Sequence, residues 1–193
     1  KPGVSSSVAF NPGMNSQYDH LPVDLDTDGD LDLLVIAGES GGSTGQMRWQ
    51  RLRNDGGGAF TSFGAADVVS LGLYEPSRQR VVAAARIDAG TSVDVVGVGI
   101  SRLPAGTITA QSTLFLRRGN GNGTLQAPET IDATLGLAVA VLAFDAEGDG
   151  DNDLIVLDRG TTFETSTQVP GALYVYRNDG SGGFTREPVL AAG

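Results

Sequence analysis

The chain contains no cysteine, only one histidine, and aromatic residues amount to 6% of its 193 positions. The lack of cysteine excludes disulfide bonds, thiolate metal ligands and a thiol nucleophile. No apolar run approaches the length of a transmembrane helix, so direct membrane insertion is not expected. Basic residues form no stripe, which argues against nucleic acid as a partner.

The sequence is instead rich in glycine and acid. It has 28 glycines, 40% hydrophobic residues and a formal net charge of −10. This composition is typical of a β-rich domain with many turns and is too apolar for a disordered chain.

Much of the acidity lies in two similar loops, residues 24–32 and 145–153. Each has carboxylates at positions 1, 3, 5, 7 and 9 around a glycine at position 6. Such crowding is unfavourable unless a cation neutralises it, and oxygen ligands alone favour a hard ion such as Ca²⁺. The sequence therefore predicts two Ca²⁺ sites, with these candidate ligands: Asp24, Asp26, Asp28, Asp30 and Asp32 in the first loop, and Asp145, Glu147, Asp149, Asp151 and Asp153 in the second.

The loops are not EF-hands. Val35 and Val156 stand at position 12, where an EF-hand has its bidentate glutamate. The residues that follow, Leu31 to Ile36 and Leu154 to Leu157, are short runs typical of buried strands. Each acidic loop is thus expected to join two strands.

The acidic loops belong to a repeat of about 60 residues. Asp32, Asp94 and Asp153 head three apolar runs at separations of 62 and 59 residues. Further along each copy, an arginine precedes an apolar residue by seven positions across an Asn/Gly turn; the pairs are Arg53 with Phe60, Arg118 with Leu125, and Arg177 with Phe184. Each repeat is therefore predicted to contain four antiparallel strands, A to D, as a propeller blade does.

The combined pattern resembles the FG-GAP or VCBS repeats of integrin-α-like β-propellers. The resemblance implies an all-β fold and calcium-binding A–B loops in a single repeat domain over 1–193, with blades at about 18–70, 78–132 and 135–191. Residues 1–17 would then be an N-terminal segment that can supply a closing strand. Because such propellers usually have seven blades, three blades imply a partial propeller, completed by further blades of a longer chain or by a homo-oligomer.

The middle repeat departs from the acidic pattern. Its ligand positions hold Arg86, Asp88, Gly90, Ser92 and Asp94. Arg86 would repel a cation, so we regard this loop as degenerate. Our hypothesis is that the Arg86 guanidinium takes the place of the metal and pairs with Asp88 or Asp94; the alternative is that Arg86 points to solvent.

The usual components of an enzyme active site are missing from the sequence, and a non-enzymatic protein is expected. The single histidine, His20, precedes an acidic loop and is assigned a structural role. No G-x-S-x-G motif follows a strand. The alternating carboxylates converge on one point, which suits a cation better than a sugar ring.

Ligand binding is expected in the long, variable B–C loops. The candidate residues, which can also be ordinary solvated loop residues, are Glu39, Arg102, Thr107, Phe163 and Glu164. Trp49 is assigned to the core. The favoured function is a calcium-stabilised adhesion or ligand-binding module for a protein or glycan. We expect it to be extracellular, on the cell surface or periplasmic, where calcium is abundant. The alternatives are a structural or assembly module of a larger complex, and a lectin-like accessory domain of a secreted enzyme.

Overall fold

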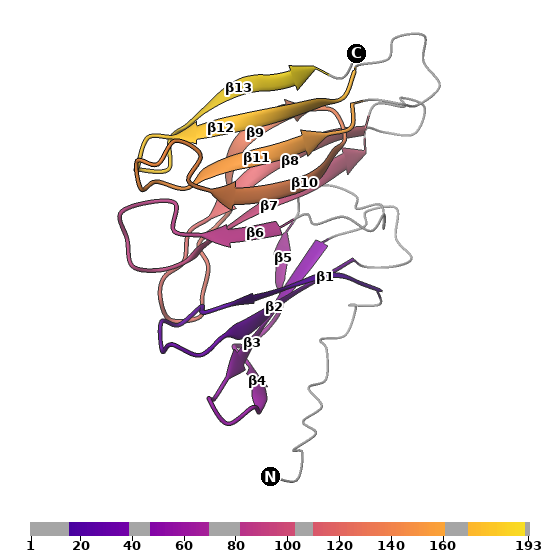
Figure 1. Cartoon of the computed structure of the whole chain (residues 1–193). Helices are drawn as coiled ribbons and strands as arrows, with labels where there is room; N and C mark the ends of the chain where they lie inside the picture. The colour runs from indigo at the N-terminus through magenta and orange to yellow at the C-terminus, as the bar shows by residue number, and fades with distance from the viewer. Residues whose placement is uncertain (1–15, 39–46, 70–81, 103–109, 161–169, 192–193) are drawn as a thin grey trace.

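The computed structural model describes residues 16–38, 47–69, 82–102, 110–160 and 170–191, and these form three antiparallel sheets (Figure 1). The described residues contain strands, turns and bends but no helix, and hence no helix that could cross a membrane. Each sheet corresponds to one sequence repeat, here called repeats 1, 2 and 3. The three sheets do not close into a ring.

Repeat 1 contains β1 (Ser16–Val23), β2 (Asp32–Gly38), β3 (Met47–Asn54), β4 (Phe60–Ser62) and β5 (Asp67–Val69). The first four strands are adjacent in chain order, and β5 pairs with the other end of β3. The fourth strand position is therefore shared by two short strands.

The other two repeats have four strands each, again adjacent in chain order. Repeat 2 contains β6 (Val82–Ala85), β7 (Asp94–Arg102), β8 (Ala110–Arg117) and β9 (Glu129–Leu135). Repeat 3 contains β10 (Ala138–Phe144), β11 (Asp153–Asp158), β12 (Ala172–Asn178) and β13 (Phe184–Ala191). The predicted all-β architecture of three antiparallel repeats is confirmed.

The sheets are stacked so that their first strands, β1, β6 and β10, lie in sequence across the molecule (Figure 1). The three A–B loops all lie at the same end of the sheets. Antiparallel pairing brings each C–D turn to that end as well, beside the A–B loop of its own repeat.

Repeats 1 and 2 pack through an aromatic contact. Trp49 and Phe115 are fully buried with ring centroids 5.6 Å apart, and the Arg117 guanidinium lies 5.4 Å from the Trp49 ring centroid. Phe115 pairs with Gly97 on the neighbouring strand, where a Cβ would lie 2.5 Å from its ring. Gly97 thus provides space for the ring, and the assignment of Trp49 to the core is confirmed.

Repeats 2 and 3 are joined by polar groups around Asp132. Its Oδ2 accepts hydrogen bonds from Tyr176 Oη and Arg186 Nη1, both at 2.8 Å. The Ala138 amide donates to Ser112 Oγ at 2.9 Å. These contacts supplement an apolar layer that includes Leu154 and Val156.

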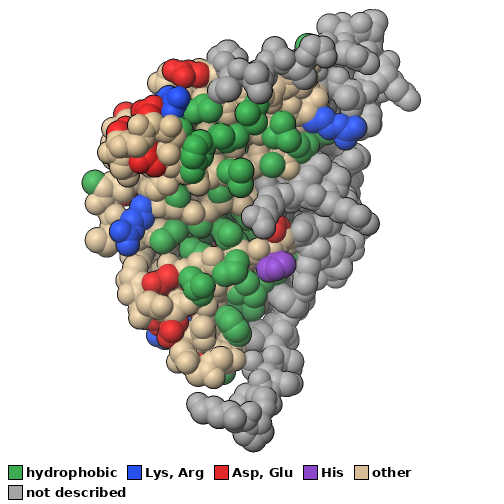
Figure 2. All heavy atoms as spheres, viewed as in Figure 1, with side chains coloured by type: hydrophobic (Ala, Val, Ile, Leu, Met, Phe, Trp, Pro, Cys, Tyr) green, Lys and Arg blue, Asp and Glu red, His purple; other side chains and the backbone are tan. Residues whose placement is uncertain are grey.

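Within the described residues, no sheet packs on the far side of repeat 3, and apolar side chains are exposed there. Leu142, Phe144 and Leu157 are 51%, 39% and 46% exposed. The residues equivalent to Leu157 in repeats 1 and 2, Ile36 and Val98, are buried because the following repeat packs on that side. Figure 2 shows hydrophobic side chains gathered over the sheet of repeat 3 and continuing toward β6 and β1.

Candidate metal centre

The ninth position of every A–B loop is a buried aspartate that fastens the loop to its own sheet. Asp32 Oδ2 accepts the Leu25 N–H at 2.9 Å, and its Oδ1 accepts the Asn54 N–H at 2.9 Å. The other two aspartates make the same pair of bonds: Asp94 with Ile87 and Gly119, and Asp153 with Ala146 and Asn178. These bonds give position 9 a structural role in all three repeats.

Burial raises the pKa of Asp32 and Asp94, against the lowering effect of these backbone N–H groups. Because the same anchor occurs in repeat 2, which lacks the acidic pattern, the recurrence of Asp at position 9 does not require a metal. From the sequence alone, the aspartate at position 9 was predicted to be a metal ligand in the two acidic repeats.

The seventh position lies against a glycine of the C–D turn. A Cβ on Gly56 would lie 2.5 Å from Asp30 Oδ2, and one on Gly180 would lie 2.6 Å from Asp151 Oδ2. Both glycines also have positive φ, 73° and 77°, which other residues rarely adopt. The turn glycines therefore let the acidic loop approach the C–D turn closely.

In repeat 1 the side chains at positions 1, 3 and 5 converge. Asp24, Asp26 and Asp28 each place an oxygen within 4.8 Å of the others. Asp24 Oδ1 and Asp26 Oδ1 are buried and have no hydrogen-bond partner within the part of the chain that the structure describes. Two buried carboxylate oxygens without partners are costly, and a cation would satisfy both.

The backbone of this loop is folded around the carboxylates. Thr27 and Gly29 have φ of 62° and 92°, which turn the chain sharply. The Gly29 amide donates to Asp24 Oδ2 at 3.2 Å, and the Asp30 amide donates to Asp28 Oδ1 at 3.0 Å. The latter bond, followed by the nearby Arg53, lowers the pKa of Asp28 and so favours its ionised form.

The acidic loop of repeat 3 has a similar backbone but a different arrangement of carboxylates. Gly148 and Gly150 have positive φ, and their amides donate to the two oxygens of Asp145 at 2.6 and 3.0 Å. These two bonds lower the Asp145 pKa. Among the described residues only the repeat 1 triad brings three carboxylates together, so the two predicted sites are not equivalent.

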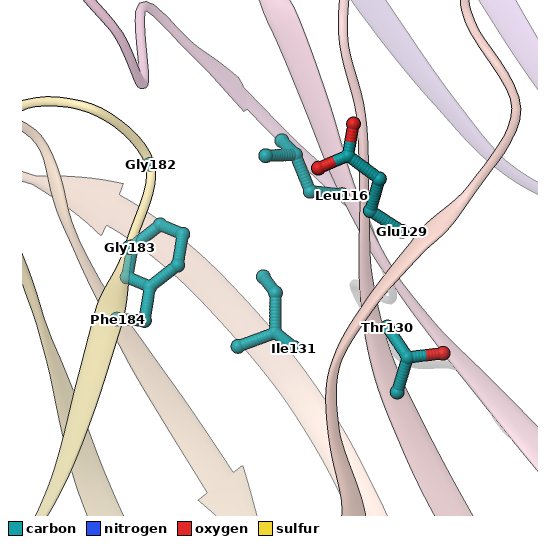
Figure 3. Close-up of a pocket in the computed structure, with 7 residues that line it drawn as sticks. All are labelled: Leu116, Glu129, Thr130, Ile131, Gly182, Gly183 and Phe184. Carbon is teal, nitrogen blue, oxygen red and sulfur yellow. The ribbon is translucent and has the colours of Figure 1, made fainter.

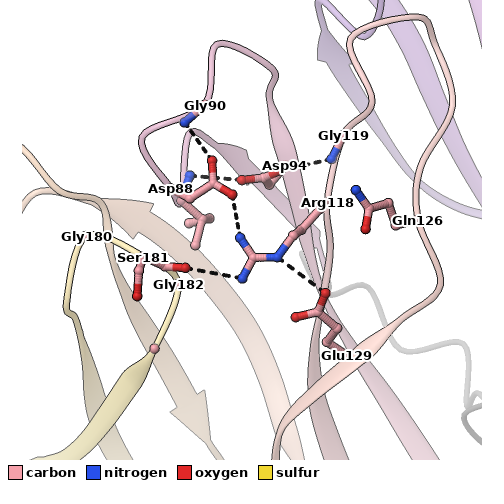
Figure 4. Close-up of polar contacts among 12 residues, drawn as sticks. Asp88, Gly90, Asp94, Arg118, Gly119, Gln126, Glu129, Gly180, Ser181 and Gly182 are labelled. Atoms are coloured by element: carbon pink, nitrogen blue, oxygen red, sulfur yellow. Dashed lines mark hydrogen bonds and ion pairs between the residues drawn. The ribbon is translucent and has the colours of Figure 1, made fainter.

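Repeat 2 contains an arginine at the loop, but a different one from that expected. Arg118 Nη1 pairs with Asp88 Oδ2 at 2.5 Å (Figure 4). Arg86 is exposed. Both oxygens of Asp94 are held by backbone N–H groups. The hypothesis that Arg86 supplies the internal cation is therefore wrong, because Arg118 on the neighbouring strand end occupies that place.

The arginines before the C–D turns were recognised in the sequence only as landmarks of the repeat. In the structure each pairs with position 3 of its own loop: Arg53 Nε with Asp26 at 3.1 Å, Arg118 with Asp88, and Arg177 Nη1 with Glu147 at 2.8 Å. The sequence signal for these contacts was the recurrence of an arginine at one position in all three repeats.

A pocket of about 230 Å³ lies between repeats 2 and 3 (Figure 3). Its lining combines the apolar side chains of Leu116, Ile131 and Phe184 with polar groups of the chain. Glu129 is the one ionisable residue of the lining, and its Oε1 lies 3.3 Å from Arg118 Nε. The lining offers one carboxylate, already paired, and gives no reason to place catalysis there.

The other sequence-predicted residues are placed as follows. Arg102 is the last residue of β7. Glu39, Thr107, Phe163 and Glu164, with the variable B–C loops and the N-terminal segment 1–15, lie outside the described residues. His20 is exposed on β1, and its amide donates to Asp19 Oδ1.

No family model matches the chain, and no curated protein matches it in sequence. Support for a function therefore comes from the acidic A–B loops, the C–D turns and the fold of the chain.

Proposed function

We propose that this chain forms calcium-stabilised blades of a β-propeller and serves in adhesion or ligand binding rather than catalysis. The observation that carries the proposal is the convergence of Asp24, Asp26 and Asp28, with two buried oxygens that lack partners. The resemblance to FG-GAP or VCBS repeats supports it, as does the stacking of three antiparallel sheets with their first strands adjacent.

The residues fit Ca²⁺ by their chemistry. The converging ligands are carboxylate oxygens only, which suit a hard divalent ion. Asp24, Asp26 and Asp28 would hold the ion in repeat 1, and Asp145, Glu147 and Asp149 are the counterparts in repeat 3. Bound Ca²⁺ would neutralise the crowded carboxylates and hold the loop between β1 and β2 in one conformation.

Ligand recognition is proposed for the variable B–C loops, because the ends of strands B and C that these loops join lie opposite the A–B loops in the antiparallel topology. A rigid sheet stack with metal-fixed turns would hold these loops in place for a protein or glycan ligand. An extracellular, cell-surface or periplasmic location follows from the calcium that weak loop sites need.

The experiment that tests the proposal is thermal unfolding in EDTA and in millimolar CaCl₂. Binding to the folded state alone must raise the midpoint, by an amount that grows with the ratio of the calcium concentration to the Kd. We expect Asp26→Asn to abolish most of the rise. Asp55→Asn, which alters an exposed carboxylate in the C–D turn outside the triad, is the matched control and should retain it. A wild-type midpoint unchanged by calcium would refute the metal assignment.

The exposed apolar side of repeat 3 favours a second candidate, an assembly module. Its residues Leu142 and Leu157 correspond to positions that the next repeat covers in repeats 1 and 2. We propose that a sheet of the same kind covers this side, supplied by a second copy of the chain. Sedimentation velocity should show mass increasing with concentration, and Leu142→Gln with Leu157→Gln should abolish the increase. A wild-type monomer at high concentration would refute it.

A further inference from the structure

The arginine that ends strand C contacts the A–B loop in all three repeats. Arg53 and Arg177 are the last-but-one residues of β3 and β12, and Arg118 follows β8 directly. The residue after each arginine donates its backbone N–H to the position 9 aspartate. This bond fixes the distance between the strand end and the loop, so the arginine side chain reaches position 3.

Repeat 2 shows what this arginine does when the loop has few acids. Arg118 pairs with Asp88 and Glu129 and donates to the Ser181 carbonyl oxygen of repeat 3 (Figure 4). It is only 22% exposed at the side chain. Arg118 thus serves as a permanent cation at a loop that lacks the acidic pattern, and it also links two repeats.

In repeat 1 the corresponding arginine is held less firmly. The Arg53 side chain is 50% exposed and lies 3.1 Å from Asp26 Oδ2 and 3.5 Å from Asp28 Oδ2. Both of these carboxylates belong to the converging triad. A divalent ion held by the triad would lie close to the guanidinium, and the two positive charges would repel each other.

Repeat 3 provides its arginine with an alternative partner. Arg177 Nη1 pairs with Glu147 at 2.8 Å, and its Nε lies 3.7 Å from Glu187 on β13. Glu187 stands outside the acidic loop, so Arg177 can release position 3 and keep an ion pair.

We propose that these strand-C arginines set the metal affinity of their loops. Arg53 and Arg177 act as resident counter-charges that stabilise the metal-free loop, and a divalent ion must compete with them for position 3. Arg118 keeps the same place permanently. This inference rests on the proposed calcium function for repeats 1 and 3, and it makes these arginines affinity-determining residues outside the ligand set.

The test is a calorimetric titration of Ca²⁺ into wild type, Arg53→Gln and Arg118→Gln. Removal of one unit charge beside a divalent ion in a solvated loop should tighten the repeat 1 site about tenfold. Arg118→Gln makes the same chemical change at a loop without the triad, so it should leave the Ca²⁺ Kd unchanged. Arg53→Lys, which keeps the charge, should remain close to wild type.

A second readout separates this effect from general damage. In EDTA, Arg53→Gln should melt below wild type because the crowded carboxylates lose their counter-charge. In saturating CaCl₂ it should melt at or above wild type, since the ion replaces that charge. If Arg53→Gln binds calcium with an affinity equal to or weaker than that of wild type, this inference is overturned but the proposed calcium function is not. Absence of binding in both proteins would overturn the proposed function, and this inference with it.

Discussion

Tyr176 Oη donates a 2.8 Å hydrogen bond to Asp132 Oδ2 across the junction of repeats 3 and 2. Tyr176 is 1% exposed, and the carboxylate also accepts from Arg186 and Thr134. Although burial would raise the pKa of Asp132, these donors lower it, so the group is ionised at neutral pH. The junction is therefore held by a charged acceptor with several donors.

Removing the phenol hydroxyl should weaken this junction. Tyr176→Phe retains the ring but deletes a hydrogen bond to an ionised group, which is worth about 1.5–3 kcal/mol. Urea unfolding should show a loss of this size in the free energy of unfolding, without a change in fold by circular dichroism. A loss below about 0.5 kcal/mol, the range of neutral surface changes, would contradict it.

Alkaline pH should act on the same residue. Burial, followed by the hydrogen bond to Asp132, raises the pKa of Tyr176 above its ordinary value of 10.0. A raised folded-state pKa gives stability that is complete below pH 10 and is lost as the pH rises further, at up to about 1.4 kcal/mol per pH unit. Unfolding measured between pH 9 and 11.5 should show this slope in wild type and a smaller slope in Tyr176→Phe.

The aspartate at position 9 should stabilise the folded protein in every repeat, with or without calcium. Asp94→Asn leaves one of the two backbone N–H groups, of Ile87 or Gly119, without its acceptor at a buried site. A cost of about 1–3 kcal/mol is expected. Because repeat 2 has no acidic triad, the loss should be equal in EDTA and in CaCl₂. A loss that appears only in calcium would show that position 9 acts through a metal.

The two acidic loops should bind calcium with different affinities. The ligands of repeat 1 already converge, whereas those of repeat 3 must move. A calcium titration should therefore resolve a tighter and a weaker site. Asp26→Asn should remove the tighter one, and Glu147→Gln the weaker one. Two sites of equal affinity, or loss of the tighter site in Glu147→Gln, would contradict this order.

Gly97→Ala should destabilise the junction of repeats 1 and 2 by about 1–3 kcal/mol, the usual cost of overpacking. The added methyl would lie 2.5 Å from the Phe115 ring. The double variant Gly97→Ala with Phe115→Leu should recover part of the loss relative to the sum of the single variants. Strict additivity would mean that the two side chains do not meet.

Sequence reasoning predicted the strands well and the site in part. Short apolar runs after Asp32, Asp94 and Asp153, with Asn/Gly turns, suffice to define four strands per repeat because both signals are local. The anchoring role of the same aspartates could not be read in this way, since their donors include Asn54 and Asn178, more than 20 residues away.

The arginine that pairs with the A–B loop of repeat 2 was predicted wrongly for a similar reason. Arg86 is only two residues from Asp88 in the sequence, but Arg118, 30 residues away, is brought to Asp88 by the pairing of β7 with β8. The two acidic loops differ in whether their carboxylates converge. This difference depends on side-chain positions and cannot be read from sequences with nearly identical spacing. The variable loops lie outside the described residues, so the proposed ligand residues there stay predictions.

The backbone of Leu25 makes hydrogen bonds both within its own repeat and to the next one, and this affects how the protein unfolds. Its N–H is held by Asp32 of its own repeat, and its carbonyl oxygen accepts the Gly123 N–H of repeat 2 at 2.9 Å. In the next junction the Asn178 side chain donates to the equivalent carbonyl of Ile87. Each A–B loop of repeats 1 and 2 is thus hydrogen-bonded to the following repeat. An ion bound in repeat 1 should therefore slow hydrogen exchange in β8 and β9, and the repeats should melt as one cooperative unit rather than one after another.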